Sequence, residues 1–433
     1  MSNAVLRFVH ASDLHLERPL HGLVDVPDGL RELFLEAPYR AAVRLFDHVL
    51  AADAQFLILA GDVAHPGYTS PRGPLFLVEQ FNRLAERGID VYWAGGQVDP
   101  LEAWPAGLPL PPNVHRFPAT SSTEFVVHNS ALPVRLMGRN RRRQTKIRHA
   151  EFRSEKDEYF TIAVAHGEAD ATLLKNLAVE YWALGGSHRA KRLAADRRVA
   201  HYPGTHQGRN PDESGAHGCS LVQVDDLGRI AIKQLVTDVV RWRPELVEAP
   251  EDATAAWLEG ELRQRLQTAI AADPAMTWLV SATVSCGERL EKELAYDGLM
   301  TSLLRRLAVH VGLNRPQGLQ IAPPPGSTPP AFAGEIASSG GAYCVSVEAD
   351  PTSDLSRKSW PPQTLAGDFT QLAEAFLADT NSPLDLTSLL ESTDHSQILG
   401  KAAIVRSPKL RQRLVRKATG LGVELLSGEG PKS

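Results

Sequence analysis

The stretch Val5-Leu6-Arg7-Phe8-Val9-His10-Ala11-Ser12-Asp13-Leu14-His15 decides the fold expected for this chain. It begins as an apolar run typical of a buried strand and ends in a carboxylate and an imidazole separated by one residue. Carboxylate and imidazole ligands together are typical of sites for manganese, iron or zinc. The stretch therefore predicts a strand whose end supplies half of a metal site.

The residues that follow alternate between short apolar runs and longer segments of helical spacing. We expect strands at 54–60, 89–94, 160–165 and 181–184, and helices at 37–52 and 74–87. Three closely spaced strands are expected at 199–202, 219–224 and 230–236, with a hairpin turn between the last two. This order predicts a layered α/β domain over residues 1–242.

The rest of the chain is predicted to form smaller parts. A proline-bounded segment at 244–250 indicates a boundary, and residues 245–320 should form a small α/β domain with a helix at 253–272, a strand at 277–285 and a helix at 290–311. Residues 321–341 are rich in Pro, Gly and Ser and are typical of a linker. Residues 342–433 should hold one strand and a helical region with a basic tail.

Composition favours an ordinary globular protein. The chain has 433 residues, 43% of them apolar and 22% charged, with a net charge of -5. No run approaches about 18 apolar residues, and the N-terminus lacks the pattern of a secretory signal. The three cysteines, Cys219, Cys286 and Cys344, lie far apart, which argues against a disulfide framework or a zinc ribbon. We expect a cytoplasmic protein.

Polar residues follow several of the predicted strands at the point where each strand ends. Because the loops after the strands of an α/β sheet converge on one edge, these side chains are expected to meet there. A carboxylate among them, such as Asp62, can bridge two ions. The set consists of Asp13, His15, Asp62, His166 and His188.

Residues 13–15, 61–62, 96–100, 166 and 185–188 follow one another in an order that resembles a known series of signatures. These are the D-x-H, G-D, G-N-H-D, H and G-H-x-H motifs of the calcineurin-like metallophosphoesterases. Within that superfamily the chain is similar to the SbcD and YhaO group of DNA repair exonucleases over residues 5–242. Segments 8–16, 181–185, 202–209, 213–215 and 218–219 carry this similarity. The resemblance implies a four-layer β-sandwich flanked by helices, followed by a small capping domain and a helical tail.

The resemblance also implies two metal ions, most often Mn²⁺. The first ion would take Asp13, His15, Asp62 and His188, and the second would take Asp62, His166 and the Asn of G-N-H-D. Three positions depart from the family pattern. Gln97 replaces that Asn and keeps an amide oxygen that could coordinate the second ion. Val98 replaces the catalytic His, and Gly186 replaces a His ligand of the second ion. Asp99 keeps the last position of G-N-H-D and is a candidate catalytic residue.

Further residues are candidates for roles near the metals or on a nucleic acid. His65 and His206 lie in segments that the family fold brings near the metals, where either could act as a ligand or acid, or as a polar loop residue. A basic run could contact phosphates or be a solvated loop. It comprises Arg139, Arg141, Arg142, Arg143, Lys146 and Arg148.

Three functions remain open from the sequence. The first is a metal-dependent exonuclease-like phosphodiesterase acting on double-stranded DNA, as a partner of an SbcC-like coiled-coil ATPase and as a homodimer, as the resemblance implies. The second is a degenerate DNA-binding subunit of such a complex that keeps one ion. The third is a phosphodiesterase for small molecules. The loss of a positioned acid at Val98 typically costs about 10²- to 10⁴-fold in rate.

Overall fold

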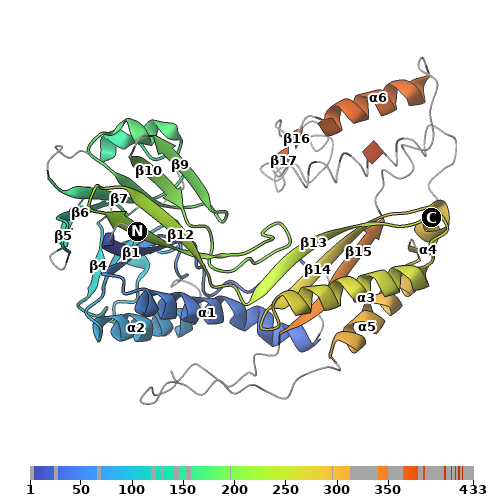
Figure 1. Ribbon diagram of the computed structural model, residues 1–433, viewed down its shortest axis with the longest axis horizontal. Helices are drawn as coiled ribbons and strands as arrows, with labels where there is room; N and C mark the ends of the chain where they lie inside the picture. Colours follow the sequence, from blue (N-terminus) through green and yellow to red (C-terminus); the bar gives the residue numbers. More distant parts are fainter. Residues whose placement is uncertain are drawn as a thin grey trace. The chain divides into compact units, whose positions relative to one another are not determined.

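The computed structural model describes most of the chain and divides it into two compact units. The described residues are 4–23, 28–65, 70–118, 123–127, 130–140, 146–152, 158–195, 197–294, 296–312, 340–349, 364–378, 384–385, 404–405, 411, 415, 418–419 and 422. One unit comprises residues 1–243, 270–279 and 315–341, and the other comprises 244–269, 280–314 and 342–433 (Figure 1). The linker predicted at 321–341 lies outside the described residues, apart from its last two.

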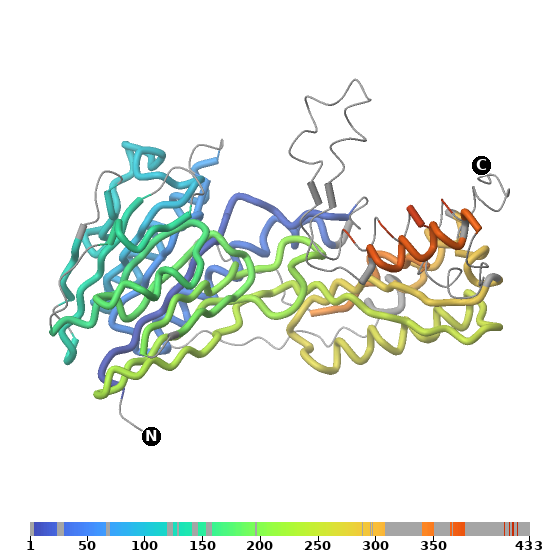
Figure 2. The backbone as a smooth tube through the Cα atoms, turned by 90° about the horizontal axis from the view of Figure 1, so that it is seen from above, coloured from blue at the N-terminus to red at the C-terminus, as the bar shows by residue number. Residues whose placement is uncertain are grey.

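The first sheet of the first unit has the order β12-β11-β1-β2-β3-β4. Its parallel centre is formed by β1 (Ala4–Ala11), β2 (Phe56–Ala60), β3 (Asp90–Ala94) and β4 (Val114–Arg116). The hairpin of β11 (Gly218–Asp225) and β12 (Ile230–Val236) extends it, with β11 antiparallel to β1. Figure 2 shows the dark-blue β1 running beside this hairpin. Residues near both ends of the unit's chain thus meet in one sheet.

The second sheet has the order β5-β6-β7-β8-β10-β9. The four central strands, β6 (Val134–Gly138), β7 (Phe160–His166), β8 (Tyr181–Gly185) and β10 (Arg198–Tyr202), are parallel. The edge strands β5 (Thr123–Val127) and β9 (Lys191–Ala195) are antiparallel to their neighbours. Both sheets therefore have parallel centres, and the loops after their strands can build one site.

Three apolar clusters hold these layers together. Phe8, Ile58, Ile162 and other residues of both sheets fill the space between them. The outer face of the first sheet packs against helices α1 (Asp28–Ala51) and α2 (Arg72–Ala85) (Figure 1). The outer face of the second packs on Phe152 and on the short helix η3 (Ala171–Lys175). This is the four-layer α/β architecture that the sequence predicts.

Helix α1 is longer than predicted and contains Pro38. A proline inside a helix removes one backbone hydrogen bond and leaves the carbonyl four residues earlier unpaired. Here that carbonyl, Phe34 O, accepts a hydrogen bond from Leu20 N at 3.0 Å, a distance typical of such bonds. The Pro38 carbonyl accepts from His206 Nε2 at 2.7 Å. The helix continues past the proline because the loop that contains Leu20 supplies a new partner for the Phe34 carbonyl.

The second unit contains a sheet with the strand order β13-β14-β15, flanked by helices. The strands are β13 (Val240–Glu248), β14 (Thr277–Ser285) and β15 (Gly341–Ala349). The helices are α3 (Ala255–Ala272), α4 (Glu288–Leu294), α5 (Asp297–Gly312) and α6 (Leu365–Ala378), and β16 (Leu384–Asp385) pairs with β17 (Ile404–Val405). Among the described residues, no helix has the length and apolar character needed to cross a membrane.

A polar chain crosses the apolar core between the two sheets of the first unit. His10 Nδ1 lies 3.1 Å from the Tyr181 hydroxyl, and His201 Nε2 lies 2.8 Å from Ser220 Oγ. The His10 and His201 rings lie edge to face at a centroid distance of 5.9 Å. Burial lowers the pKa of both imidazoles, that of His201 to about 4, and the charge of Arg192 lowers the latter further. Both histidines are therefore neutral in the folded protein at pH 7.

We expect this pair to make the fold sensitive to acid. Each histidine has a lower pKa in the folded chain than its value of about 6.5 in the unfolded chain, so the unfolded state binds more protons below that pH. The stability is fully present above pH 6.5, and His201 alone should cost about 2 kcal/mol by pH 5. Urea unfolding at pH 7, 6 and 5 should show a shallower decline for His201→Gln than for the native chain. Equal declines would contradict the expectation.

Candidate metal centre

The turns after β1 and β2 adopt a left-handed backbone at the residues that carry the predicted ligands. The φ angles are 55° at Asp13, 46° at His15 and 53° at Asp62. Residues other than glycine rarely occupy this region, and such strain concentrates at functional sites. Two backbone hydrogen bonds hold the turns together, from Asp13 N to Gly61 O at 2.9 Å and from His15 N to Asp62 O at 3.0 Å. The two turns thus form one rigid unit.

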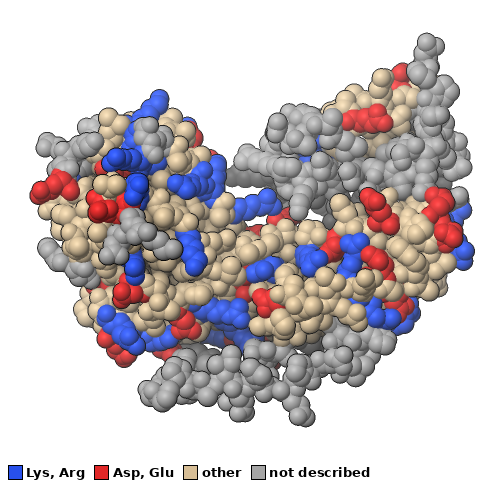
Figure 3. All heavy atoms as spheres, viewed as in Figure 1, with Lys and Arg blue, Asp and Glu red and all other residues tan. Residues whose placement is uncertain are grey.

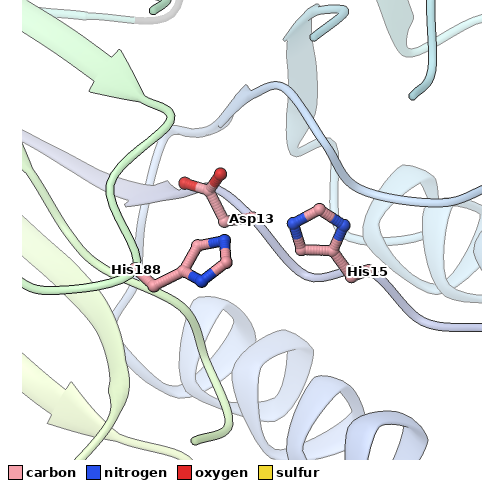
Figure 4. Close-up of side chains that lie close together, drawn as sticks. All are labelled: Asp13, His15 and His188. Atoms are coloured by element: carbon pink, nitrogen blue, oxygen red, sulfur yellow. The ribbon is translucent and has the colours of Figure 1, made fainter. Parts of the chain in front are cut away.

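One group of potential ligands combines Asp13 and His15 with His188 from the loop after β8. One ligand atom from each residue lies within 4.8 Å of the others. Figure 4 shows the three side chains gathered between the turn after β1 and the loop after β8. Asp13 and His15 are 1% and 4% exposed, whereas the side chain of His188 is 36% exposed. His188 therefore marks the side of this group that solvent reaches.

A second group shares Asp13 and adds Asp62 and His166. Asp62 Oδ2 lies 3.4 Å from His166 Nε2 and 3.9 Å from His15 Nε2. Burial opposes the charged forms of both partners, but their attraction prevails. It lowers the pKa of Asp62 and, with Asp13, raises that of His166 to about 9. The five predicted ligands thus meet at one edge, with Asp13 common to both groups.

The three imidazoles are oriented in the same way. Nδ1 of His15 lies 2.9 Å from His65 Nε2, Nδ1 of His166 donates to Ala60 O at 2.9 Å, and Nδ1 of His188 lies 2.6 Å from Glu213 Oε1. Such contacts fix the tautomer and direct the other ring nitrogen, as partners of metal-bound histidines do.

Two further observations fit a divalent cation. Nε2 of His15 is buried and has no hydrogen-bond partner among the described residues, which costs free energy unless a ligand satisfies it. The donor set of carboxylate and imidazole groups suits Mn²⁺, Fe²⁺ or Zn²⁺. The residues present therefore fit a metal, with Asp13, His15, Asp62, His166 and His188 able to hold it.

Asp99, the candidate catalytic residue, is engaged by backbone groups in the structure. Its buried carboxylate accepts hydrogen bonds from the backbone N–H groups of Asp62, Val63 and Gly96 and from Trp93 Nε1, at 2.7–3.1 Å. With both oxygens engaged in this way, Asp99 anchors the turn that carries Asp62. Its observed contacts are those of a positioning residue.

The three positions that depart from the family pattern lie in the loops around Asp62 and Asp13. Gln97 is exposed, and Val98 contributes its backbone N–H, which donates to Asp62 Oδ1 at 3.0 Å. The backbone N–H of Gly186 donates to Asp13 Oδ2 at 3.0 Å. Gly186 has a φ of 102°, and a Cβ there would lie 3.2 Å from Gly167 N. A histidine at this position would therefore strain the present loop.

The two additional histidines are both buried and belong to neither ligand group. His65 contacts the ring of His15 and its own N–H donates to Glu17 Oε2 at 2.7 Å. His206 donates to Pro38 O, and its side chain is 0% exposed. In the structure, His65 supports a ligand and His206 joins a loop to helix α1.

The basic run at 139–148 is only partly described, because Arg141, Arg142 and Arg143 lie outside the described residues. Arg139 Nη1 lies 3.7 Å from Glu151 Oε2, and Lys146 Nζ lies 2.5 Å from Asp170 Oδ2. Arg148 is exposed. Two of the three described cations are thus paired with acids. On the face seen in Figure 3, basic and acidic side chains are interspersed over the first unit.

Comparison with known proteins agrees with this geometry. Residues 6–190 match the family model described as calcineurin-like phosphoesterase. This segment is similar to calcineurin-like phosphoesterase domains and makes up less than half of the chain. The chain is also 29% identical over 262 residues to an uncharacterized metallophosphoesterase, YhaO, of Bacillus subtilis strain 168. That match covers 57% of this chain and 64% of the relative, so the chain spans less than two thirds of the relative's length. The calcineurin-like fold expected from the sequence is confirmed.

The first unit also contains two residues that support a ligand and for which no role was predicted from the sequence. Glu213 orients His188, and Arg209 lies beside both of them. Both fall within the segments that carry the sequence similarity, at 202–209 and 213–215. That similarity was the available signal, but only the folded loop shows which ligand these residues contact.

Proposed function

We propose that this chain is a divalent-metal-dependent phosphoesterase that hydrolyses phosphodiester bonds, with DNA as its substrate. The observation that carries the proposal is the meeting of Asp13, His15, Asp62, His166 and His188 at one edge. A divalent ion bound there would lower the pKa of a coordinated water and neutralise charge on the phosphate.

The residues of the site supply negative charge and hold the candidate ligands in fixed orientations. Two buried carboxylates supply the negative charge that a cation requires, and backbone N–H groups of Val98 and Gly186 fix their orientation. The histidine orientations set by Nδ1 leave Nε2 for coordination. A preorganised site of this kind needs no rearrangement of charges during the reaction.

DNA is favoured as the substrate by the similarity to DNA repair exonucleases and by a basic edge strand beside the site. Arg189, Lys191 and Arg192 directly follow His188 and are exposed. Basic side chains next to a hydrolytic centre can contact the phosphates that flank the cleaved bond. We extend the proposal to Mn²⁺ as the ion, a cytoplasmic location, and an SbcC-like coiled-coil ATPase as partner of a homodimer, all by the same similarity.

A second candidate is a DNA-binding subunit that keeps one ion and has lost most catalysis. Val98 and Gly186 favour it, because neither side chain can coordinate a metal or transfer a proton. The positive φ at Gly186 also indicates that the present loop is built for glycine.

Metal content and hydrolysis should separate these candidates. The native chain is expected to bind at least one Mn²⁺ in equilibrium dialysis and to cleave linear double-stranded DNA and bis(p-nitrophenyl) phosphate. Asp62→Asn, which removes a carboxylate from the group of Asp13, Asp62 and His166, should lower activity by about 10²-fold or more. The control is Asp226→Asn, at an exposed position in the β11–β12 turn, and it should behave like the native chain.

Each outcome has a distinct meaning. Hydrolysis of the small diester without cleavage of DNA would contradict the assignment of DNA as substrate. Bound metal and DNA without hydrolysis would support the binding subunit. A native chain that binds no divalent metal would overturn both candidates.

A further inference from the structure

An arginine is buried directly beside the ligand group of Asp13, His15 and His188. Arg209 lies in the loop after β10 and is 3% exposed. Its Nη2 lies 3.0 Å from Nδ1 and 3.2 Å from Nε2 of His188, so the guanidinium covers one face of that imidazole. Burying a charged group is costly unless its charge and its donors are satisfied.

The loop holds this arginine firmly by its backbone. Arg209 N donates to Glu213 Oε2 at 2.8 Å, and Arg209 O accepts from His21 N at 2.8 Å. These bonds place the side chain without using its guanidinium. The position of the charge is therefore set by the fold of the loop.

The nearest carboxylate satisfies this guanidinium only in part. Glu213 Oε1 lies 3.7 Å from Arg209 Nη2 but 2.6 Å from His188 Nδ1, so its shorter contact orients the imidazole. Arg209 Nε is buried and has no hydrogen-bond partner among the described residues. A guanidinium offers five N–H donors in a planar fork that matches the oxygens of phosphate. Arg209 thus has donors and charge available for an anion.

The charge of Arg209 also reaches the ligand groups. It interacts electrostatically with Asp13 and Asp62, and after burial it is the largest influence that lowers the pKa of His15, to about 2. A fixed positive charge here opposes cation binding slightly, so metal coordination alone gives no reason for it. An anionic substrate at the same place explains the positive charge, because the charge would attract that substrate.

We propose that Arg209 binds a non-bridging oxygen of the phosphate group held at the Asp13–His15–His188 group. The proposal rests on the phosphoesterase function proposed above and adds a positively charged contact at a site where Val98 and Gly186 provide none. A phosphate group could reach this site from the side of His188, whose side chain is 36% exposed. The ligand class is a phosphate ester or its product, inorganic phosphate.

The test is binding of inorganic phosphate, which does not depend on turnover. Isothermal titration with phosphate should be carried out on the full chain loaded with Mn²⁺, with metal content measured on the same samples. Arg209→Gln is expected to weaken phosphate binding by about 10- to 100-fold, the range for a charged hydrogen bond. Its Mn²⁺ affinity should be unchanged or higher, because a positive charge has been removed.

Two further variants make the result specific. Arg209→Lys keeps the charge and should retain more phosphate affinity than Arg209→Gln. Arg44→Gln is the matched control, since Arg44 donates to the backbone carbonyl of Asp238 at 2.8 Å and serves the fold. It should leave phosphate binding unchanged.

Three results would overturn the proposal. The first is an unchanged phosphate affinity in Arg209→Gln. The second is a parallel loss of bound Mn²⁺ in that variant, which would mean that Arg209 only supports His188. The third is a native chain that holds Mn²⁺ but binds no phosphate. If the native chain binds phosphate but hydrolyses no ester, the proposed catalytic function fails while the role of Arg209 stands.

Discussion

Asp99→Ala is expected to destabilise the first unit by about 4 kcal/mol or more and to abolish its metal binding. The substitution removes the acceptor of four buried N–H groups, from Asp62, Val63, Trp93 and Gly96. Each buried donor left without a partner costs about 1–3 kcal/mol. Because Asp99 also holds the backbone of Asp62 in its left-handed conformation, that ligand should lose its position. Urea unfolding and dialysis against Mn²⁺ measure the two effects.

The control for this prediction is Asp226→Ala, which removes an exposed carboxylate of the same kind and should change stability by less than about 0.5 kcal/mol. Asp99→Asn should lie between the two, since its amide keeps the shape but presents N–H groups to two of the donors. An Asp99→Ala chain of native stability would show that water replaces the carboxylate, and the anchoring role would be wrong.

Gly185→Ala is expected to be the most damaging small substitution near the site. Gly185 ends β8 and pairs with His166 of β7. A Cβ added there would overlap the carbonyl oxygen of Ala60 and lie 2.9 Å from His166 Nδ1. Ala60 belongs to the other sheet, so the methyl group would force the two sheets apart where the ligands meet. Overpacking of this kind typically costs about 1–3 kcal/mol, and more where backbone must move.

The matched control is Gly260→Ala in the middle of helix α3, where a Cβ would meet nothing within 4 Å. That change should stabilise its helix by about 0.5–1 kcal/mol. Calorimetry of the two variants should therefore show shifts of opposite sign. Loss of bound Mn²⁺ is expected for Gly185→Ala alone, and a shift upward in its melting temperature would contradict the steric argument.

The sequence predicted those strands of the first unit that are apolar on both faces. Residues 54–60 and 160–165 fall on β2 and β7, which are fully buried and read as unbroken apolar runs. The strands β4, β5 and β6 were not expected, because they are short and carry polar residues between apolar ones. Period and length are weak signals for such edge and near-edge strands.

Two prolines lie inside elements of the structure. The helix predicted at 37–52 begins at Asp28 and contains Pro38, and Leu20 N of a neighbouring loop satisfies the carbonyl that this proline leaves free. Pro244, at the start of the predicted boundary segment, is the first residue of the second unit, yet it lies within β13. That strand is at the edge of its sheet, where a residue without an N–H is tolerated.

The candidate metal ligands could be predicted from the sequence, whereas the residues that orient them could not. Asp13, His15 and Asp62 follow strands directly, so the chain's order places them at one edge. The roles of Glu213, Arg209 and His65 depend on how the loops after β10 and β2 fold back onto the ligands. No local pattern encodes those contacts.

The hydrogen bond between Gly186 N and the Asp13 carboxylate joins residues 173 positions apart in the chain. A chain still being synthesised has its first carboxylate ligand long before the loop that orients it, and the loop with Glu213 comes later still. Contacts of such long sequence separation form late and slowly, because loop closure costs entropy before it is rewarded. The metal centre is consequently a product of completed folding, and no N-terminal fragment that ends before β8 can assemble it.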